Sequence, residues 1–91
     1  MKEWTKVFKA LGNESRLKII RLLHSRKRLP VGKIAWDVGI SLKGTSKHLA
    51  LLKGLNILEN EGKSGRVWYY LSPSMRDEVR HVVEKFLKHI K

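Results

Sequence analysis

The sequence contains no cysteine among its 91 residues. Disulfide bonds, thiolate catalysis and every zinc site that needs sulfur are therefore excluded, and any metal ion would depend on histidine and carboxylate ligands. No apolar run approaches the roughly 20 residues that a membrane-spanning helix needs. The opening residues 1–4 also do not begin a signal peptide. We therefore expect an intracellular, cytoplasmic protein.

Acidic residues are scarce as well, because 8 Asp and Glu stand against 20 Lys and Arg, giving a formal net charge of +12. A compact body of this charge repels itself unless a polyanion or counterions neutralise it. Nucleic acid is the partner that this balance favours, and an anionic membrane surface is the competing explanation. Since 42% of the residues are apolar, the chain can build one compact core. We predict a single domain over residues 1–91.

Apolar residues at helical spacing predict four consecutive helices in the first part of the chain. The first covers residues 4–11, and the second begins after Asn13, which is a favourable N-cap residue. A short third helix covers residues 31–38. The fourth begins after Ser41, whose hydroxyl group can cap its first turn.

The apolar period then changes from 3.6 towards 2, which is typical of strands. The runs 57–61 and 66–71 flank a glycine-bearing loop and predict a β-hairpin. Ser72 and Pro73 are suited to the N-cap and first position of a last helix over residues 73–91. The expected fold is mainly α with a small β-hairpin, in the order α-α-α-α-β-β-α.

Two helices joined by a short turn at Gly39 form a helix-turn-helix, whose second helix can enter the major groove of DNA. The hairpin that follows makes the domain a winged helix. Basic and hydroxyl side chains of the second helix are our candidate DNA contacts. They are Lys43, Thr45, Ser46, Lys47 and His48. At the tip of the wing, the candidates are Lys63, Ser64 and Arg66.

Several of these residues have a second interpretation. The basic face of the second helix is also consistent with a merely solvated surface, and His48 either braces the helix or reaches a phosphate. The aromatic residues 68–70 either pack within the domain or stack on unpaired bases. Trp36 is either a lateral core residue or a contact for a partner.

The first and last helices each carry an apolar stripe that one small domain has to cover. Pairing of two copies is the simplest cover, and packing of both helices on their own domain is the alternative, which leaves a monomer. The candidate interface residues are Trp4, Phe8, Leu11, Met75, Val79, Val82, Phe86 and Ile90.

Residues 8–23 resemble the opening signature of ArsR-type winged helix-turn-helix transcriptional regulators. Residues 46–49, together with Leu52 and the pair Gly54 and Leu55, are similar to the recognition helix of that family. The resemblance covers nearly the whole chain. It implies a homodimer that binds double-stranded operator DNA as a repressor and releases it on an inducing signal, which the sequence does not identify.

Metal sensing, a trait of this family, does not follow from the resemblance. Members that sense thiophilic metals use cysteine, and zinc-sensing members use acidic and histidine ligands on the last helix. Here Asp77, His81, Glu84 and His89 depart from that spacing. We therefore predict no metal and no cofactor.

The sequence leaves two other classes of function open. The alternative is a winged helix that binds RNA or protein, or that acts as an architectural chromatin module. Such a module would have an apolar or acidic recognition helix, whereas the helix of this chain is basic. An enzyme is the least favoured class, because no nucleophile has an evident base beside it and no phosphate-cradling loop occurs, so we predict no enzymatic activity.

Overall fold

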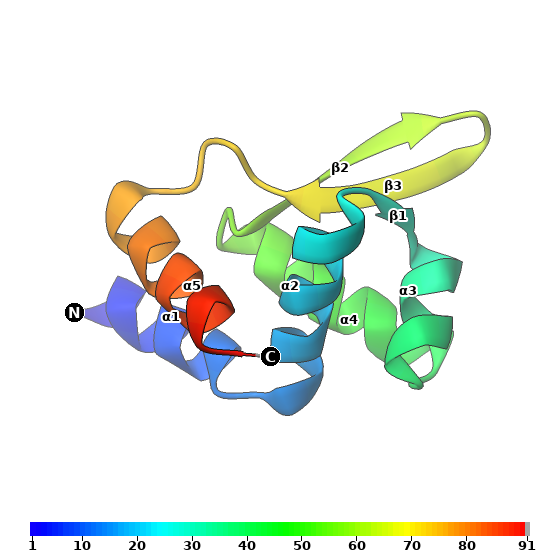
Figure 1. The fold of residues 1–91 in the computed structure, drawn as a ribbon. Helices are drawn as coiled ribbons and strands as arrows, with labels where there is room; N and C mark the ends of the chain where they lie inside the picture. Colours follow the sequence, from blue (N-terminus) through cyan, green and yellow to red (C-terminus); the bar gives the residue numbers. More distant parts are fainter. Residues whose placement is uncertain (91) are drawn as a thin grey trace.

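The computed structural model describes residues 1–90, which form helices around a small antiparallel sheet (Figure 1). In chain order the elements are α1 (Lys2–Leu11), α2 (Glu14–Arg26), β1 (Leu29–Pro30), α3 (Val31–Val38), α4 (Leu42–Gly54), β2 (Leu58–Lys63), β3 (Arg66–Leu71) and α5 (Asp77–His89). The hairpin of β2 and β3 projects at one end of the molecule, and α1 and α5 lie at the other. The predicted mainly helical fold with a β-hairpin is confirmed.

The capping residues predicted from the sequence hold the starts of α2 and α4. The side-chain oxygen of Asn13 accepts a hydrogen bond from the backbone N–H of Arg16 at 3.1 Å. Ser41 Oγ accepts one from the backbone N–H of Gly44 at 2.9 Å. Each bond satisfies a backbone donor that the first turn of a helix leaves free. The boundaries of these helices are therefore encoded locally.

The sheet has a third strand that the sequence did not predict. Leu29 pairs with Tyr69 and Pro30 with Trp68 in antiparallel register, and the strand order is β1-β3-β2. A strand of two residues is too short to show any hydrophobic period. Because β1 directly precedes α3, its pairing with β3 fixes the wing relative to the helix-turn-helix.

The predicted start of the last helix is wrong. Ser72 and Pro73 lie in a linker, and α5 begins at Asp77 with Arg76 at the N-cap position. The backbone N–H of Ser72 donates instead to the carbonyl oxygen of Ile57 at 2.9 Å. This bond holds the chain beside the sheet after β3, so the helix begins later.

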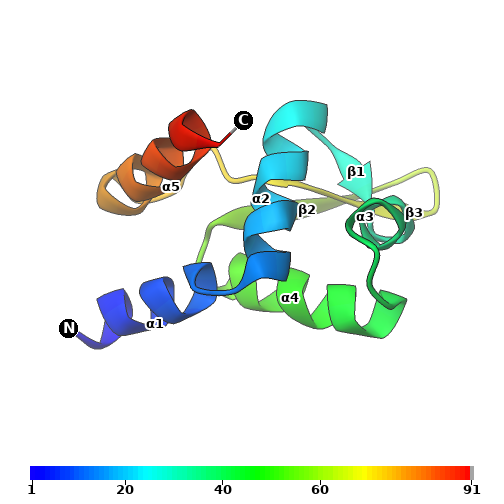
Figure 2. The same cartoon turned by 60° about the horizontal axis from the view of Figure 1, so that its bottom comes forward.

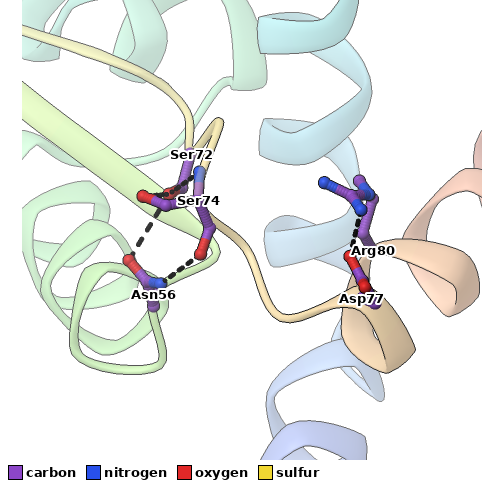
Figure 3. Close-up of polar contacts among 5 residues, drawn as sticks. All are labelled: Asn56, Ser72, Ser74, Asp77 and Arg80. Atoms are coloured by element: carbon purple, nitrogen blue, oxygen red, sulfur yellow. Dashed lines mark hydrogen bonds and ion pairs between the residues drawn. The ribbon is translucent and has the colours of Figure 1, made fainter.

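A polar cluster keeps that linker in place (Figure 3). The hydroxyl of Ser72, which is buried, donates to Glu59 Oε2 at 2.6 Å, and Ser74 Oγ donates to the same oxygen at 3.1 Å. These two hydrogen bonds, first that of Ser72, lower the pKa of Glu59 below its usual value. Asn56, two residues after the end of α4, donates from Nδ2 to the Ser74 carbonyl oxygen at 2.9 Å. The end of α4 and the linker to α5 are thereby joined.

The core lies between α2, α3, α4, the base of β2 and the inner face of α5. Its fully buried apolar side chains are those of Ile19, Ile20, Leu23, Ile34, Leu49, Leu52, Ile57 and Leu58, with Val83 of α5 nearly so. In Figure 2, α4 runs along the bottom of the molecule, with its N-terminal end beside α3 and its C-terminal end towards α1. No helix of residues 1–90 is long and apolar enough to cross a membrane.

Candidate nucleic-acid interface

The turn between α3 and α4 has the geometry of a helix-turn-helix. Gly39 adopts a left-handed conformation with φ +80°, which residues with a side chain rarely adopt. Ile40 follows it half-buried, and Ser41 caps the next helix. The outer face of α4 then presents Lys43, Ser46 and Lys47 to solvent in its first two turns. Three of the five predicted contacts of this helix therefore lie on one exposed surface.

Thr45 corrects our expectation, because it is fully buried. It precedes the buried Leu49 by four residues and so shares the inward face of α4. Its hydroxyl group has no hydrogen-bond partner within residues 1–90. Thr45 therefore packs against the core and does not belong to the exposed surface that carries Lys43 and Lys47.

Of the two interpretations of His48, the structure favours bracing. Nδ1 of His48 lies 3.2 Å from Nη1 of Arg16, whose Nε donates to the Ala10 carbonyl oxygen at 2.7 Å. Nη2 of Arg16 also donates to the Lys9 carbonyl oxygen at 3.2 Å. One guanidinium group thus binds the C-terminal end of α1 to the middle of α4. The sequence showed Arg16 only as part of a family signature.

This contact predicts a pH dependence of stability. Partial burial, and then the charge of Arg16, lower the pKa of His48 below its usual 6.5. The unfolded chain therefore binds a proton at His48 more readily than the folded chain does. Above about pH 6.5 the imidazole is neutral in both states and costs no stability, whereas the free energy of unfolding falls as the pH is lowered from there through the folded-state pKa. Urea unfolding at about pH 7.5 and about pH 5.5 should show this loss in the wild type.

His48→Gln is the matched variant, because glutamine has an oxygen that accepts from Arg16 but does not titrate. It should lose less stability between the two pH values than the wild type does. His81→Gln, at an exposed position on α5, should keep the wild-type loss. An equal loss in both variants would contradict the assignment to His48.

The wing tip is a two-residue turn that exposes its basic side chains. Ser64 and Gly65 both have positive φ values, 55° and 75°, as expected for a tight hairpin turn that matches the twist of the strands. Lys63 and Arg66 flank this turn, and all four residues are exposed. The indole N–H of Trp68 donates to the Lys63 carbonyl oxygen at 3.2 Å and braces the tip. The three predicted wing contacts are therefore accessible.

Arg28, which directly precedes β1, supports the base of the wing. Its guanidinium carbon lies 4.2 Å from the centre of the Tyr70 ring, and Nη1 contacts Glu61 Oε1 at 2.6 Å. Tyr69, on the other face of β3, packs against the core. These contacts favour packing, and not stacking on unpaired bases, as the role of the wing aromatics. Trp36, by contrast, is 82% exposed and is not a core residue.

The terminal helices leave part of their apolar surface uncovered. Trp4 and Phe8 stack with ring centres 5.5 Å apart, and Phe8 is 56% exposed. The other partly buried candidates are Leu11, Val82, Phe86 and Ile90. Met75 and Val79 correct our expectation, because each is only 6% exposed and belongs to the core of its own domain.

No group of three or more histidine or acidic side chains is close enough to hold a metal ion within residues 1–90. Asp77 instead forms an ion pair with Arg80 one turn later on α5.

Comparison with known proteins identifies the family. No protein-family model matches the chain. A cadmium resistance transcriptional regulatory protein CadC homolog from Staphylococcus aureus is 40% identical over 85 residues, which are 92% of this chain and 67% of that protein. The chain belongs to the ArsR family. CadC of Listeria innocua is 36% identical over 69 residues, 76% of this chain, and the chain spans only 57% of that relative's length.

Solved structures of ArsR-type regulators have the same fold. HlyU from Vibrio cholerae superposes with a TM-score of 0.79 at 28% identity, over 96% of this chain and 90% of HlyU. The homodimeric winged helix-turn-helix DNA-binding domain Mb0332 from Mycobacterium bovis, a possible ArsR-family regulator, gives a TM-score of 0.77 at 27% identity, over 92% of this chain and 74% of that one. The prediction of an ArsR-type DNA-binding transcriptional regulator, and not an enzyme, is thereby confirmed. Regulators of this family bind DNA as homodimers.

Proposed function

We propose that two copies of this chain pair through α1 and α5 and bind a near-palindromic duplex operator as a repressor. The observation that carries the proposal is the exposed basic face at the start of α4, where Lys43, Ser46 and Lys47 lie together. The cap at Ser41 and the turn at Gly39 hold this face at one end of the molecule.

Pairing is supported by the apolar surface at the opposite end of the domain. Phe8 is more than half exposed while stacked on Trp4, and Val82 and Phe86 of α5 are only partly buried. A second copy related by a twofold axis covers the same surface on both partners. Such a dimer presents its two recognition helices to half-sites about 34 Å apart.

The contacts divide by chemistry into two kinds. Lys47 and Lys43, four residues apart on one face of α4, donate to guanine edges or to phosphates, and Ser46 offers a short hydroxyl contact. Lys63 and Arg66, on the two sides of the wing tip, reach the phosphate backbone beside the groove. The net charge of +12 supplies long-range attraction to duplex DNA.

The inducing signal is not carried over from the relatives. One similar structure, AntR, is described as an antimony-specific transcriptional repressor, and CadC is named for cadmium resistance. Soft metal ions select thiolate ligands, and these 91 residues contain no cysteine. We therefore propose repression without a thiolate metal site in this chain.

The test is selection of random genomic fragments by the purified protein, with sequencing of the bound pool, in parallel with its mass in solution. We expect a dimer, an enriched palindromic motif and an affinity that falls steeply with salt concentration. A monomer, or binding to duplex DNA without sequence preference, would contradict the proposal. A preference for single-stranded RNA at equal salt would support the alternative interaction module.

A further inference from the structure

A groove of about 580 Å³ lies between α1 and the C-terminal half of α4, two segments that Figure 2 shows along the bottom of the molecule. Its floor is made by small or apolar residues, namely Ala10, Ala50, Leu51, Gly54 and Leu55. Ala10 is buried and Leu55 half-buried, whereas Leu51 is 44% exposed. The domain therefore leaves a continuous apolar surface accessible at this place.

The rim of this groove is cationic. Lys6 and Lys9 line it from α1, and Arg16 lines it from the first turn of α2. These three side chains form no ion pair within residues 1–90, and no acidic side chain of that range lines the groove. Glu3, one turn before Lys6, is paired with Arg76 instead. The rim thus carries three positive charges that no ion pair neutralises.

Arg16 also fixes the two helices that form the groove. Its Nε donates to the Ala10 carbonyl oxygen at 2.7 Å, and its Nη1 lies 3.2 Å from Nδ1 of His48 on α4. A site that is already shaped in the free protein costs a ligand less to bind than one that has to be ordered. The groove is therefore prepared for a ligand before the ligand arrives.

The groove is separate from the two surfaces that the proposed function uses. Helical spacing places Lys6 and Lys9 on a different side of α1 from Phe8 and the apolar stripe that pairs the two copies. On α4, the groove begins at Ala50, beyond the lysines of the first two turns. A partner seated here would therefore be additional to the second copy and to the operator.

We propose that this groove binds an acidic amphipathic helix of a partner protein. A groove between two helices accepts the apolar face of a third helix, whose anchoring side chains are three and four residues apart. These side chains pack against Leu51 and Leu55, and carboxylates on the flank of the helix pair with Lys6 and Lys9. The backbone of DNA also complements the rim, but it has little apolar surface to cover the floor. The floor therefore favours a protein helix as the occupant.

The probe is a capped synthetic peptide of sequence EAALEALEAALEAL, titrated into the whole chain labelled with ¹⁵N. As a helix it has its four leucines on one side and is about 21 Å long, close to the length of the 13-residue α4. At about 0.15 M ionic strength, long-range attraction by the net charge is largely screened. The backbone amide signals of Ala10, Gly54 and Leu55 should shift saturably. Absence of saturable shifts, or shifts confined to the first turns of α4 and the wing, would overturn the site.

Charge is tested in both partners. Glutamine in place of the four peptide glutamates should weaken binding about tenfold, as expected for the loss of exposed charge pairs. The double variant Lys6→Gln and Lys9→Gln should weaken it by about the same factor. The control, Lys27→Gln with Lys88→Gln, removes the same charge at exposed positions that do not line the groove, and it should bind as the wild type does. Equal weakening by the two double variants would overturn the role of the cationic rim.

Leu51→Gln tests the apolar floor. Because Leu51 is already 44% exposed, the variant should remain folded, which its amide spectrum shows. Loss of the apolar contact should weaken peptide binding about tenfold. Leu42→Gln is the matched control, since Leu42 is a 56% exposed leucine of the same helix that does not line the groove. Equal affinities of these two variants would overturn the packing of a helix on the floor.

Operator binding tests DNA as the other occupant. Lys6→Gln with Lys9→Gln should lower the affinity for duplex operator no more than Lys27→Gln with Lys88→Gln does. A larger loss would show that the DNA backbone occupies the groove and would overturn the proposal. The peptide titration contains no DNA, so its outcome does not depend on whether the proposed operator function is correct.

Discussion

Phe8→Glu should convert the dimer to a monomer and lower operator affinity by about 10²–10⁴-fold. The ring of Phe8 is 56% exposed in the single domain, so a carboxylate there remains solvated and the monomer stays folded. In the pair, the same carboxylate would be buried against an apolar surface without a partner, which is costly. A monomer lacks the gain in affinity that arises when two linked subunits bind two half-sites together. The size of this gain gives the expected range of the loss.

Mass in solution and titration of the operator duplex measure these two effects. Lys6→Glu, also exposed on α1 but on the helix face opposite Phe8, introduces a carboxylate away from the apolar stripe and is the control. It should remain dimeric and bind nearly as the wild type does. A dimeric Phe8→Glu variant with wild-type affinity would show that α1 does not take part in pairing.

Replacing Lys43 and Lys47 together by alanine should weaken operator binding at least about tenfold, with little effect on folding. Both side chains are exposed and form no ion pair within residues 1–90, so their loss leaves no buried group unsatisfied. Each phosphate contact contributes about 0.9 to the slope of log affinity against log salt. If both residues contact phosphates, the magnitude of the slope should fall by about 1.8 for each protomer.

The control is the double variant Lys18→Ala and Lys53→Ala, which removes the same charge. Lys18 lies on α2 and pairs with Glu14, and Lys53 lies near the C-terminal end of α4. Titrations over a salt series should give a slope closer to that of the wild type. If the two double variants behaved alike, the attraction would be a property of net charge, and the docking of α4 by its first two turns would be wrong.

The features that the sequence predicted correctly depend on short stretches of chain. Asn13 and Ser41 cap helices through bonds to residues three positions later, and Gly39 satisfies a backbone requirement at its own position. The hairpin followed from two runs of period 2 around a glycine-bearing loop. Such signals do not need knowledge of distant neighbours, which is why the winged helix-turn-helix could be recognised.

The features that the sequence missed are decided by distant residues. Arg16 contacts His48 from 32 positions away, and Arg28 meets Glu61 across 33. Ser72 is a residue type that often caps helices, but its hydroxyl group donates to Glu59 instead. Thr45 is a different case, since its spacing of four from Leu49 indicates an inward position, whereas its hydroxyl group taken alone indicates a DNA contact.

The two outer strands of the sheet have a consequence for solubility. A strand at a sheet edge exposes unpaired backbone groups, onto which a strand of another molecule can add. Here β1 is only two residues long and ends in Pro30, which has no N–H to donate, while β2 carries charged side chains at Glu59, Glu61 and Lys63. Both edges therefore discourage strand addition, so crowding many copies onto neighbouring sites of one DNA molecule should not lead to β-type aggregation.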